Sequence, residues 1–313
     1  MTRNSAIDIV KGVGILAVIV GHCIPYDCWA YKFIYTFHMP LFFIVAGFLY
    51  KPTTLLKSKF IADFRRLIVP YLIIALSFTI YLLIKENDKL FALKYSLIAT
   101  LWATGWNHAS LIWSTAPHIG IAWFLPSLFW CRQFYNFIYT KAKYRWWIIF
   151  CISLITTLID YYLINLPLGF LTGSSAMVFY LIGHCSHHIK IKRQYLIIVG
   201  AVCWIIQLNF GGIDMCFCSY TIYPVDIIGA TFASATIYYG AQYLSNTSWE
   251  KGLANIGKSS LYIYCFHAIE NEIKPYEWLP FHDSLYIEIP ARIITCLTAA
   301  YIFVSIKEKI FKR

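Results

Sequence analysis

The chain has 313 residues, of which 59% are hydrophobic and only 13% are charged. A soluble domain usually has about 25% charged residues, so this chain cannot cover its whole surface with polar groups. The net charge of +11 does not indicate a nucleic-acid partner, because most of the Lys and Arg residues gather on one side of the membrane spans predicted below.

Apolar runs of about 20 residues, the length of a membrane span, recur along the chain. They occupy residues 8–24, 33–50, 67–84, 117–138, 146–164, 168–186, 194–210, 223–244, 258–274 and 285–306. We therefore expect an all-α integral membrane protein with about ten transmembrane helices, forming one transmembrane domain over residues 1–313 without a separate soluble domain. An even number of spans puts both termini on one side, which the basic linkers 51–66 and 139–145 mark as cytoplasmic.

The segment 90–114 is apolar, but Lys94, Gly105, Asn107 and His108 interrupt it. Counting it as a span would give eleven helices and would move the basic segment KAKYR to the outside. We therefore interpret it as an interfacial or re-entrant element on the outer face, where its Trp residues suit the interface.

The first apolar run, which contains KGVGILAVIVGH, keeps a cation and an imidazole at opposite ends. Lys11 and His22 are separated by three helical turns, so they share a face and lie about 16 Å apart. Asp8, three residues before Lys11, can pair with it. Polar side chains in a span are candidates for function. The plainer alternative is that Lys11 reaches toward the cytoplasmic surface and His22 only caps the helix.

The second apolar run opens with His38 and Pro40 in FHMPLFF. A short loop joins the first two helices, so we expect His22 and His38 to approach each other at the same depth. Gly47 allows close packing, and we expect its partner to be the first helix.

The third run begins with RRLIVPY, in which Arg65 and Arg66 stand at the cytoplasmic end. Two adjacent guanidinium groups suit phosphate, because each offers a planar fork of donors. Simple anchoring by the positive-inside rule is the alternative interpretation.

These motifs together resemble the membrane-bound acyltransferase family 3, and in particular the fucose-4-O-acetylase-like sugar O-acetyltransferases. The resemblance extends from residue 8 to residue 267 and rests on the Lys11 and His22 spacing, FHMPLFF, RRLIVPY, AWFLPSLF and NIGKSSLYIYCFH. It implies a ten-helix enzyme that moves an acyl group, usually acetyl, from cytoplasmic acyl-CoA to a hydroxyl, often of a glycan beyond the membrane. Family members more often carry arginine at the position of Lys11, and often serine at that of Ala46.

The resemblance implies roles for several side chains. Lys11, Arg65 and Arg66 would hold the phosphates of acetyl-CoA, and His22 would act as general base, because a histidine near neutral pH suits this task. His38, His118 or Trp123 would orient the base or stabilise the oxyanion. The expected partners are acyl-CoA, a carbohydrate or lipid-linked glycan acceptor and membrane lipids, in a bacterial inner membrane, with a homo-oligomer left open.

Other polar residues carry weaker predictions. His267 suits structural packing and a site role equally. Four acidic residues near outer helix ends are interpreted as solvated caps in preference to acceptor-binding groups: Asp160, Asp226, Glu270 and Glu272. No metal is expected, because the i,i+4 pair His184 and His188 has no carboxylate beside it.

Two further classes of protein are alternatives to the enzyme. A glycan or small-molecule transporter would line its path with polar residues, but it should show repeats and broken helices at mid-membrane, and the polar groups here lie at the two faces. If the protein were only a structural partner of a polysaccharide synthase, the placement of Lys11 and His22 on one helix face would have no explanation.

Overall fold

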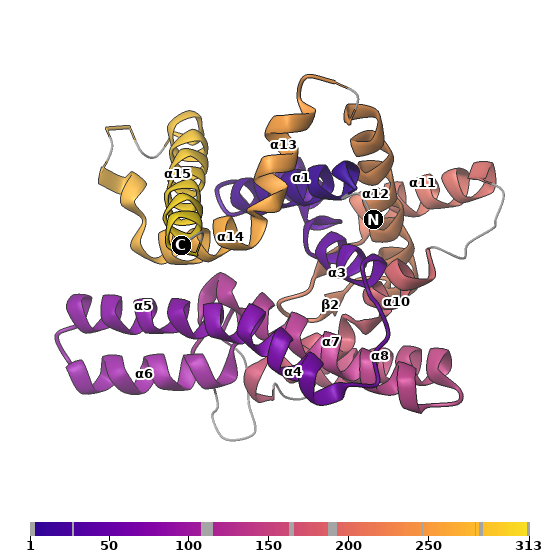
Figure 1. The fold of residues 1–313 in the computed structure, drawn as a ribbon, viewed down its shortest axis with the longest axis horizontal. Coiled ribbons are helices and arrows are strands. Elements are labelled where there is room, and N and C mark those ends of the chain that lie inside the picture. Colours follow the sequence, from indigo (N-terminus) through magenta and orange to yellow (C-terminus); the bar gives the residue numbers. More distant parts are fainter. Residues whose placement is uncertain are drawn as a thin grey trace. The chain divides into compact units, whose positions relative to one another are not determined.

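The computed structural model is a helical protein (Figure 1). It describes residues 4–26, 28–107, 115–162, 166–186, 193–245, 247–278, 280–281 and 284–311. The α-helices are α1 (Ser5–Gly21), α2 (Trp29–Tyr35), α3 (His38–Phe48), α4 (Leu56–Asp63), α5 (Val69–Lys85), α6 (Lys89–Trp102), α7 (Phe124–Lys141), α8 (Arg145–Tyr162), α9 (Phe170–Ser175), α10 (Met177–Cys185), α11 (Arg193–Phe210), α12 (Tyr223–Leu244), α13 (Glu250–Lys258), α14 (Ser260–Ile273) and α15 (Leu285–Phe311).

Shorter elements connect these helices. They are the π-helical turn η1 (Phe64–Ile68), the 3₁₀ turns η2 (Gly120–Trp123), η3 (Pro167–Gly169) and η4 (Pro275–Trp278), and the strands β1 (Ile213–Asp214) and β2 (Ser219–Tyr220). The two strands pair antiparallel, with Ile213 opposite Tyr220.

The helices form two compact units. Unit 1 consists of Met1–Phe42, Arg193–Gly211 and Pro224–Arg313, and unit 2 consists of Phe43–Lys192 and Gly212–Tyr223. The prediction of a single transmembrane domain stays a prediction.

In unit 1, α1 packs against α13 through two glycines. A Cβ added at Gly12 would overlap the backbone oxygen of Leu253, and one added at Gly257 would overlap the backbone oxygen of Asp8. The two backbones therefore touch, as in membrane helix pairs joined by small residues. This contact fixes how α1 is held, and α1 carries the candidate site at its end.

In unit 2, Gly47 packs against a different helix from the one expected. A Cβ added at Gly47 would overlap the backbone of Tyr180 in α10, and one added at Gly183 would overlap the backbone of Ile44. The expectation that Gly47 contacts the first helix is therefore wrong, since two reciprocal glycines seat α3 on α10 and no side chain separates their backbones.

Three stretches of helix are long and apolar enough to cross a membrane in the described part of the chain: Trp29–Phe48, Leu56–Lys85 and Leu285–Ile310. A fourth is the pair Pro167–Ser175 and Met177–Cys185, which is bent by 45°. Each remaining predicted span also coincides with a helix, which confirms the helical fold. The count of about ten spans and the cytoplasmic side of both termini stay predictions.

Two predicted spans are broken by local chemistry. The run 33–50 is divided into α2 and α3, because Pro40 has no N–H to continue the helical ladder. The run 168–186 bends after Ser175, where the hydroxyls of Ser174 and Ser175 bond to the carbonyls of Phe170 and Thr172. Such side-chain-to-backbone bonds bend helices.

The segment after α5 turns back to form α6, and the two helices lie side by side (Figure 1). The side chains along α6 include a stripe that is exposed at helical spacing, formed by Leu90, Leu93, Leu97 and Leu101. An exposed leucine stripe suits contact with lipid. At 14 residues, α6 is shorter than a span needs. The interfacial or re-entrant interpretation of 90–114 stays a prediction, and residues 108–114 lie outside the described residues.

Candidate active site

The first helix holds its cation as predicted. The ammonium of Lys11 donates to Oδ1 of Asp8 at 3.1 Å, which confirms the pairing. The side chain of Asp8 is buried, whereas that of Lys11 is 22% exposed, so the cation remains accessible. An ammonium carries three donors, so the pair with Asp8 leaves donors for another anion.

The other end of α1 brings His22 next to His267. His22 is the C-cap and keeps helical angles, with φ −89° and ψ −1°, so the register from Lys11 is preserved. Its ring centroid lies 5.5 Å from that of His267 in α14, with the two rings tilted by 48°. His267 therefore lies beside the candidate base, and its role, in packing or in the site, stays a prediction.

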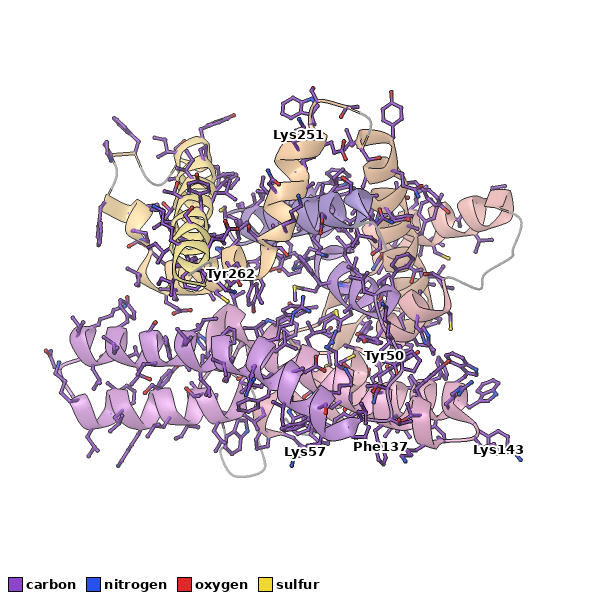
Figure 2. The ribbon with its side chains drawn as sticks, in the orientation of Figure 1. Tyr50, Lys57, Phe137, Lys143, Lys251 and Tyr262 are labelled. Carbon is purple, nitrogen blue, oxygen red and sulfur yellow. The ribbon has the colours of Figure 1, made fainter. Side chains whose placement is uncertain are left out.

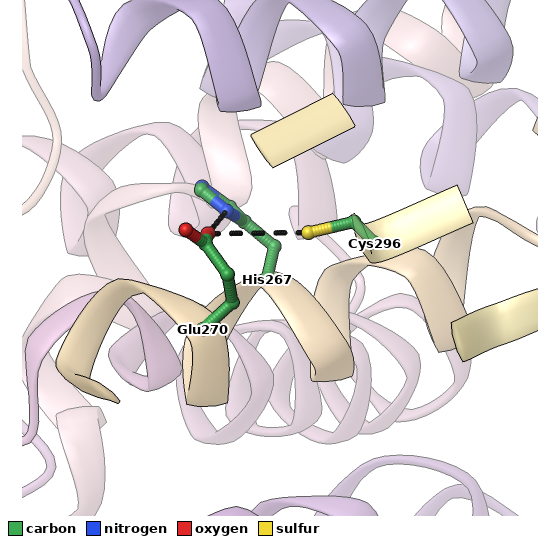
Figure 3. Close-up of side chains that lie close together, drawn as sticks. All are labelled: His267, Glu270 and Cys296. Atoms are coloured by element: carbon green, nitrogen blue, oxygen red, sulfur yellow. Dashed lines mark hydrogen bonds and ion pairs between the residues drawn. The ribbon is translucent and has the colours of Figure 1, made fainter. Parts of the chain in front are cut away.

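His267 is completely buried, and one of its nitrogens is fixed by a carboxylate. Its Nδ1 lies 3.1 Å from Oε2 of Glu270, one helical turn away (Figure 3). Among the described residues, its Nε2 has no hydrogen-bond partner. Glu270 thus holds the imidazole at Nδ1, and Nε2 is available to donate or accept a hydrogen bond.

Arg292 of α15 joins the elements of this site. Its Nε lies 3.0 Å and 3.2 Å from the two carboxylate oxygens of Glu270, and its Nη2 donates to Oδ1 of Asn271 at 2.5 Å. Its Nη1 donates to Oε1 of Glu288 and to the backbone oxygen of His22, both at 3.1 Å. A buried guanidinium needs such partners, because an unpaired charge is very costly there.

The connection between α14 and α15 covers the guanidinium. The ring of Tyr276, in η4, lies 5.2 Å from the Cζ of Arg292. Burial, with the nearby Glu288 carboxylate, raises the pKa of Tyr276 to about 12, so the phenol is neutral at physiological pH.

The interpretation of the acidic residues as solvated caps is wrong for three of the four. Glu270 is only 5% exposed, and Asp160 and Asp226 are fully buried, while Glu272 is partly exposed. Each lies near a helix end in sequence, but helix packing encloses it. The guanidinium of Arg292 compensates the negative charge of the Glu270 carboxylate.

Four residues of this cluster were not predicted from the sequence: Arg292, Asn271, Glu288 and Cys296. One signal was present: Arg292 lies inside the apolar run 285–306, and a charged residue in a span is by default a functional candidate. Asn271 and Glu288 lie near helix ends, and nothing in their local sequence distinguishes them from caps.

His38 is buried at the start of α3, and its Nδ1 donates to the backbone oxygen of Ile34 at 3.0 Å. Its ring lies 4.4 Å from that of Tyr35. His22 interacts electrostatically with His38 as well as with His267 and Arg292. The approach of the two predicted histidines is therefore supported, although His267 is the one in ring contact.

A metal site is the other chemistry that this cluster suggests. Nδ1 of His267, a carboxylate oxygen of Glu270 and Sγ of Cys296 lie within 4.8 Å of one another, and these donor types suit zinc (Figure 3). However, the guanidinium of Arg292 contacts both carboxylate oxygens. A second cation beside it would be repelled, so we assign Glu270 to Arg292 and His267.

The remaining predicted site residues belong to unit 2 and are described within it. Arg65 and Arg66 are exposed in η1, a type of turn that is frequent at functional sites. Trp123 is buried in η2. His118 accepts a hydrogen bond from the N–H of Gly120 at 3.2 Å. Their roles beside His22 stay predictions.

The i,i+4 pair weighed as a metal site is only partly described. Nδ1 of His184 lies 2.8 Å from the hydroxyl of Tyr135, so it has a protein partner. His188 lies outside the described residues.

The comparison with protein families bears directly on this arrangement. The model of acyltransferase family 3, which is described as an acyltransferase domain, matches residues 4–305. No curated protein and no solved structure gives a significant match. Because the match covers nearly the whole chain and includes α1, α14 and α15, the protein belongs to acyltransferase family 3 and is a membrane acyltransferase.

Proposed function

We propose that the protein is an O-acyltransferase that moves an acetyl group from cytoplasmic acetyl-CoA to a hydroxyl of a sugar or cell-surface glycan. The observation that carries this proposal is the pair of imidazoles, His22 and His267, at the C-terminal end of α1, with an accessible cation, Lys11, three turns earlier on the same helix. Family membership supplies the reaction class. The proposed location is a bacterial inner membrane.

The donor is proposed to bind through its phosphates. Lys11 offers an ammonium, and the exposed Arg65 and Arg66 offer guanidinium forks that suit phosphate geometry. Along α1 the cation and the imidazole lie about 16 Å apart. The long arm of CoA would bridge this distance, with its phosphates at the cytoplasmic end and its thioester near His22.

His22 is proposed as the general base. The acceptor hydroxyl gives its proton to the imidazole while its oxygen attacks the thioester carbon. The carbon–sulfur bond then breaks, and the CoA sulfur receives the proton from the imidazolium. Base catalysis of this kind contributes about 10²- to 10⁴-fold. His38, His118 and Trp123 remain proposed orienting or oxyanion-binding groups.

Transfer of acetyl label tests this function. Purified protein in liposomes receives acetyl-labelled acetyl-CoA and a glycan fraction, and wild type is compared with His22→Ala. We expect transfer by wild type and a loss of at least 100-fold in the variant, with acetyl-CoA binding retained. Equal transfer by both proteins would exclude His22 as the base. If the wild-type protein neither transfers acetyl nor turns over the thioester with any acceptor, the proposed O-acyltransferase activity is contradicted.

One feature favours a transporter as the second candidate. The bend between α9 and α10 resembles the discontinuous helices at which transporters bind their substrates. Flux of oligosaccharide across protein-containing liposomes, measured without acyl-CoA, distinguishes the two functions. Flux that does not depend on acyl-CoA would favour the transporter.

A further inference from the structure

Glu270 determines which nitrogen of His267 carries the proton. A carboxylate paired with a guanidinium is ionised and can only accept hydrogen bonds. Nδ1 of His267, 3.1 Å from Oε2 of Glu270, must therefore be the N–H donor. In a neutral imidazole the other nitrogen, Nε2, is then an acceptor with a free lone pair. This assignment follows from the partner atoms alone.

Nε2 of His267 is a buried hydrogen-bond acceptor without a partner among the described residues, which is unusual. The residue is fully buried, and Nε2 has no partner in the described part of the chain. Buried polar atoms are nearly always hydrogen-bonded. The imidazole of His22 lies beside it, at a centroid distance of 5.5 Å and a tilt of 48°, but no direct hydrogen bond joins the two rings. Such bonds often tighten only when substrate binds.

We propose that Arg292, Glu270 and His267 form a positioning chain that sets the tautomer of His22. The proposal rests on the proposed function, with His22 as base. Nε2 of His267 accepts the N–H from one ring nitrogen of His22, so the other ring nitrogen of His22 keeps its lone pair for the acceptor hydroxyl. Without the chain, His22 can present an N–H to the hydroxyl and cannot accept its proton.

Arg292 acts on both ends of this chain. Its Nε holds the carboxylate of Glu270, and its Nη1 holds the backbone oxygen of His22. The same guanidinium therefore fixes Glu270, which orients His267, and it also fixes His22, which His267 orients. During transfer the hydroxyl proton moves to His22 and then to the CoA sulfur, so Arg292, Glu270 and His267 gain and lose no proton. They are positioning residues.

The substitution Glu270→Gln tests the chain. The glutamine amide has nearly the same shape but can donate to Nδ1, which moves the proton of His267 to Nε2. We expect kcat to fall by about 10²- to 10⁴-fold, as for other bases held in the wrong tautomer. KM for acetyl-CoA should stay within about twofold, because the proposed phosphate contacts lie at the other end of α1. Glu270→Asp, which keeps the carboxylate, should restore part of the rate.

The matched control is Glu277→Gln. Glu277 is paired with Lys274 at 3.5 Å, and both side chains are half exposed. The same chemical change at that position should leave kcat and KM as in wild type.

A spectroscopic measurement reports the tautomer without requiring turnover. Histidine-selective ¹⁵N NMR of the protein in lipid should show Nδ1 of His267 protonated in wild type and Nε2 protonated in Glu270→Gln, with the signal assigned by its loss in His267→Asn. An unchanged tautomer would overturn the chain even if the rate fell. If the tautomer of His267 switches in Glu270→Gln while the wild-type protein shows no transferase activity with any acceptor, the chain is supported and the proposed function is contradicted.

Two further results would overturn the proposal. A loss of acetyl-CoA binding in Glu270→Gln equal to the loss of rate would indicate a structural role. A stoichiometric metal ion in the purified protein that is lost in Cys296→Ser would show that His267, Glu270 and Cys296 form a metal site.

Discussion

Nη1 of Arg292 donates a hydrogen bond to the backbone oxygen of His22 at 3.1 Å, across 270 residues of sequence. The last helix of the chain thereby fixes the end of the first. The same guanidinium satisfies the carboxylates of Glu270 and Glu288. The buried Glu270, the partly buried Glu288 and the backbone of the candidate base thus depend on one side chain.

Loss of Arg292 should destabilise unit 1 strongly. In Arg292→Gln the carboxylates of Glu270 and Glu288 lose their cation, and breaking a buried pair costs about 3–5 kcal/mol. Thermal denaturation in detergent, followed by loss of the monodisperse species, measures the change. In a Glu270→Gln background the same substitution should cost clearly less, because one unpaired charge has been removed. Equal costs in both backgrounds would show that the pair does not stabilise the fold.

The glycine contact between α1 and α13 should tolerate no side chain. Gly257→Ala forces a methyl group into the backbone oxygen of Asp8, and overpacking of this kind costs about 1–3 kcal/mol. Gly252→Ala is the control on the same helix, because nothing lies within 4 Å of its added Cβ. That control should be neutral or stabilising by up to about 1 kcal/mol. Gly257→Ala should therefore lower the thermal stability, whereas Gly252→Ala should leave it unchanged or raise it, and an equal loss in both variants would contradict the tight contact.

Lys11 should govern the affinity for the donor. Lys11→Ala removes a charge-assisted contact, so KM for acetyl-CoA should rise by about 10- to 100-fold with kcat little changed. Lys11→Arg should give a KM equal to or below that of wild type, since a guanidinium binds phosphate in two places. Lys251→Ala is the control, because Lys251 is exposed on α13 (Figure 2). A fall in kcat without a change in KM would place Lys11 in the chemical step instead.

The acidic residue at the end of α4 should be essential for stability in unit 2. Asp63 accepts hydrogen bonds from Lys59 at 2.7 Å, from Arg132 at 3.0 Å and from Gln133 at 2.8 Å, and it is 4% exposed. Asp63→Ala leaves two cations without their partner and should cost about 3–5 kcal/mol. Thermal denaturation tests this loss.

The matched comparison for Asp63 is a surface ion pair. Lys274→Ala removes the pair with Glu277, in which both side chains are half exposed, and should change stability by at most about 1 kcal/mol. If Asp63→Ala and Lys274→Ala changed stability by similar amounts, the burial of Asp63 would not determine how much it contributes to the stability of unit 2.

The helices and the first half of the site follow from patterns that are local in sequence. The apolar runs locate the helices because a span needs about 20 apolar residues in a row. Asp8, Lys11 and His22 lie on one helix, so helical geometry alone relates them. The pairing of Asp8 with Lys11 was therefore predictable, and the structure confirms it.

The second half of the site depends on contacts between distant segments. Glu270 and Arg292 look like a helix cap and an isolated arginine until α14 packs on α15. α13 was also missed, because it has only nine residues and, although it is amphipathic, it is not apolar enough overall to form an apolar run; its contact with α1 is made at glycine backbone. Hydropathy cannot detect such a contact.

The contact of Gly12 with α13 also constrains how the protein is made. The first helix emerges early in synthesis, yet the residues that receive it, Leu253 and Gly257, follow about 240 residues later. During translation, α1 must therefore wait without the helix that covers its glycine face. Unit 1 can close only when the ribosome has nearly finished the chain, and Arg292 then completes it from α15. A stalled or truncated chain would leave the first helix without its partner and its glycine face uncovered.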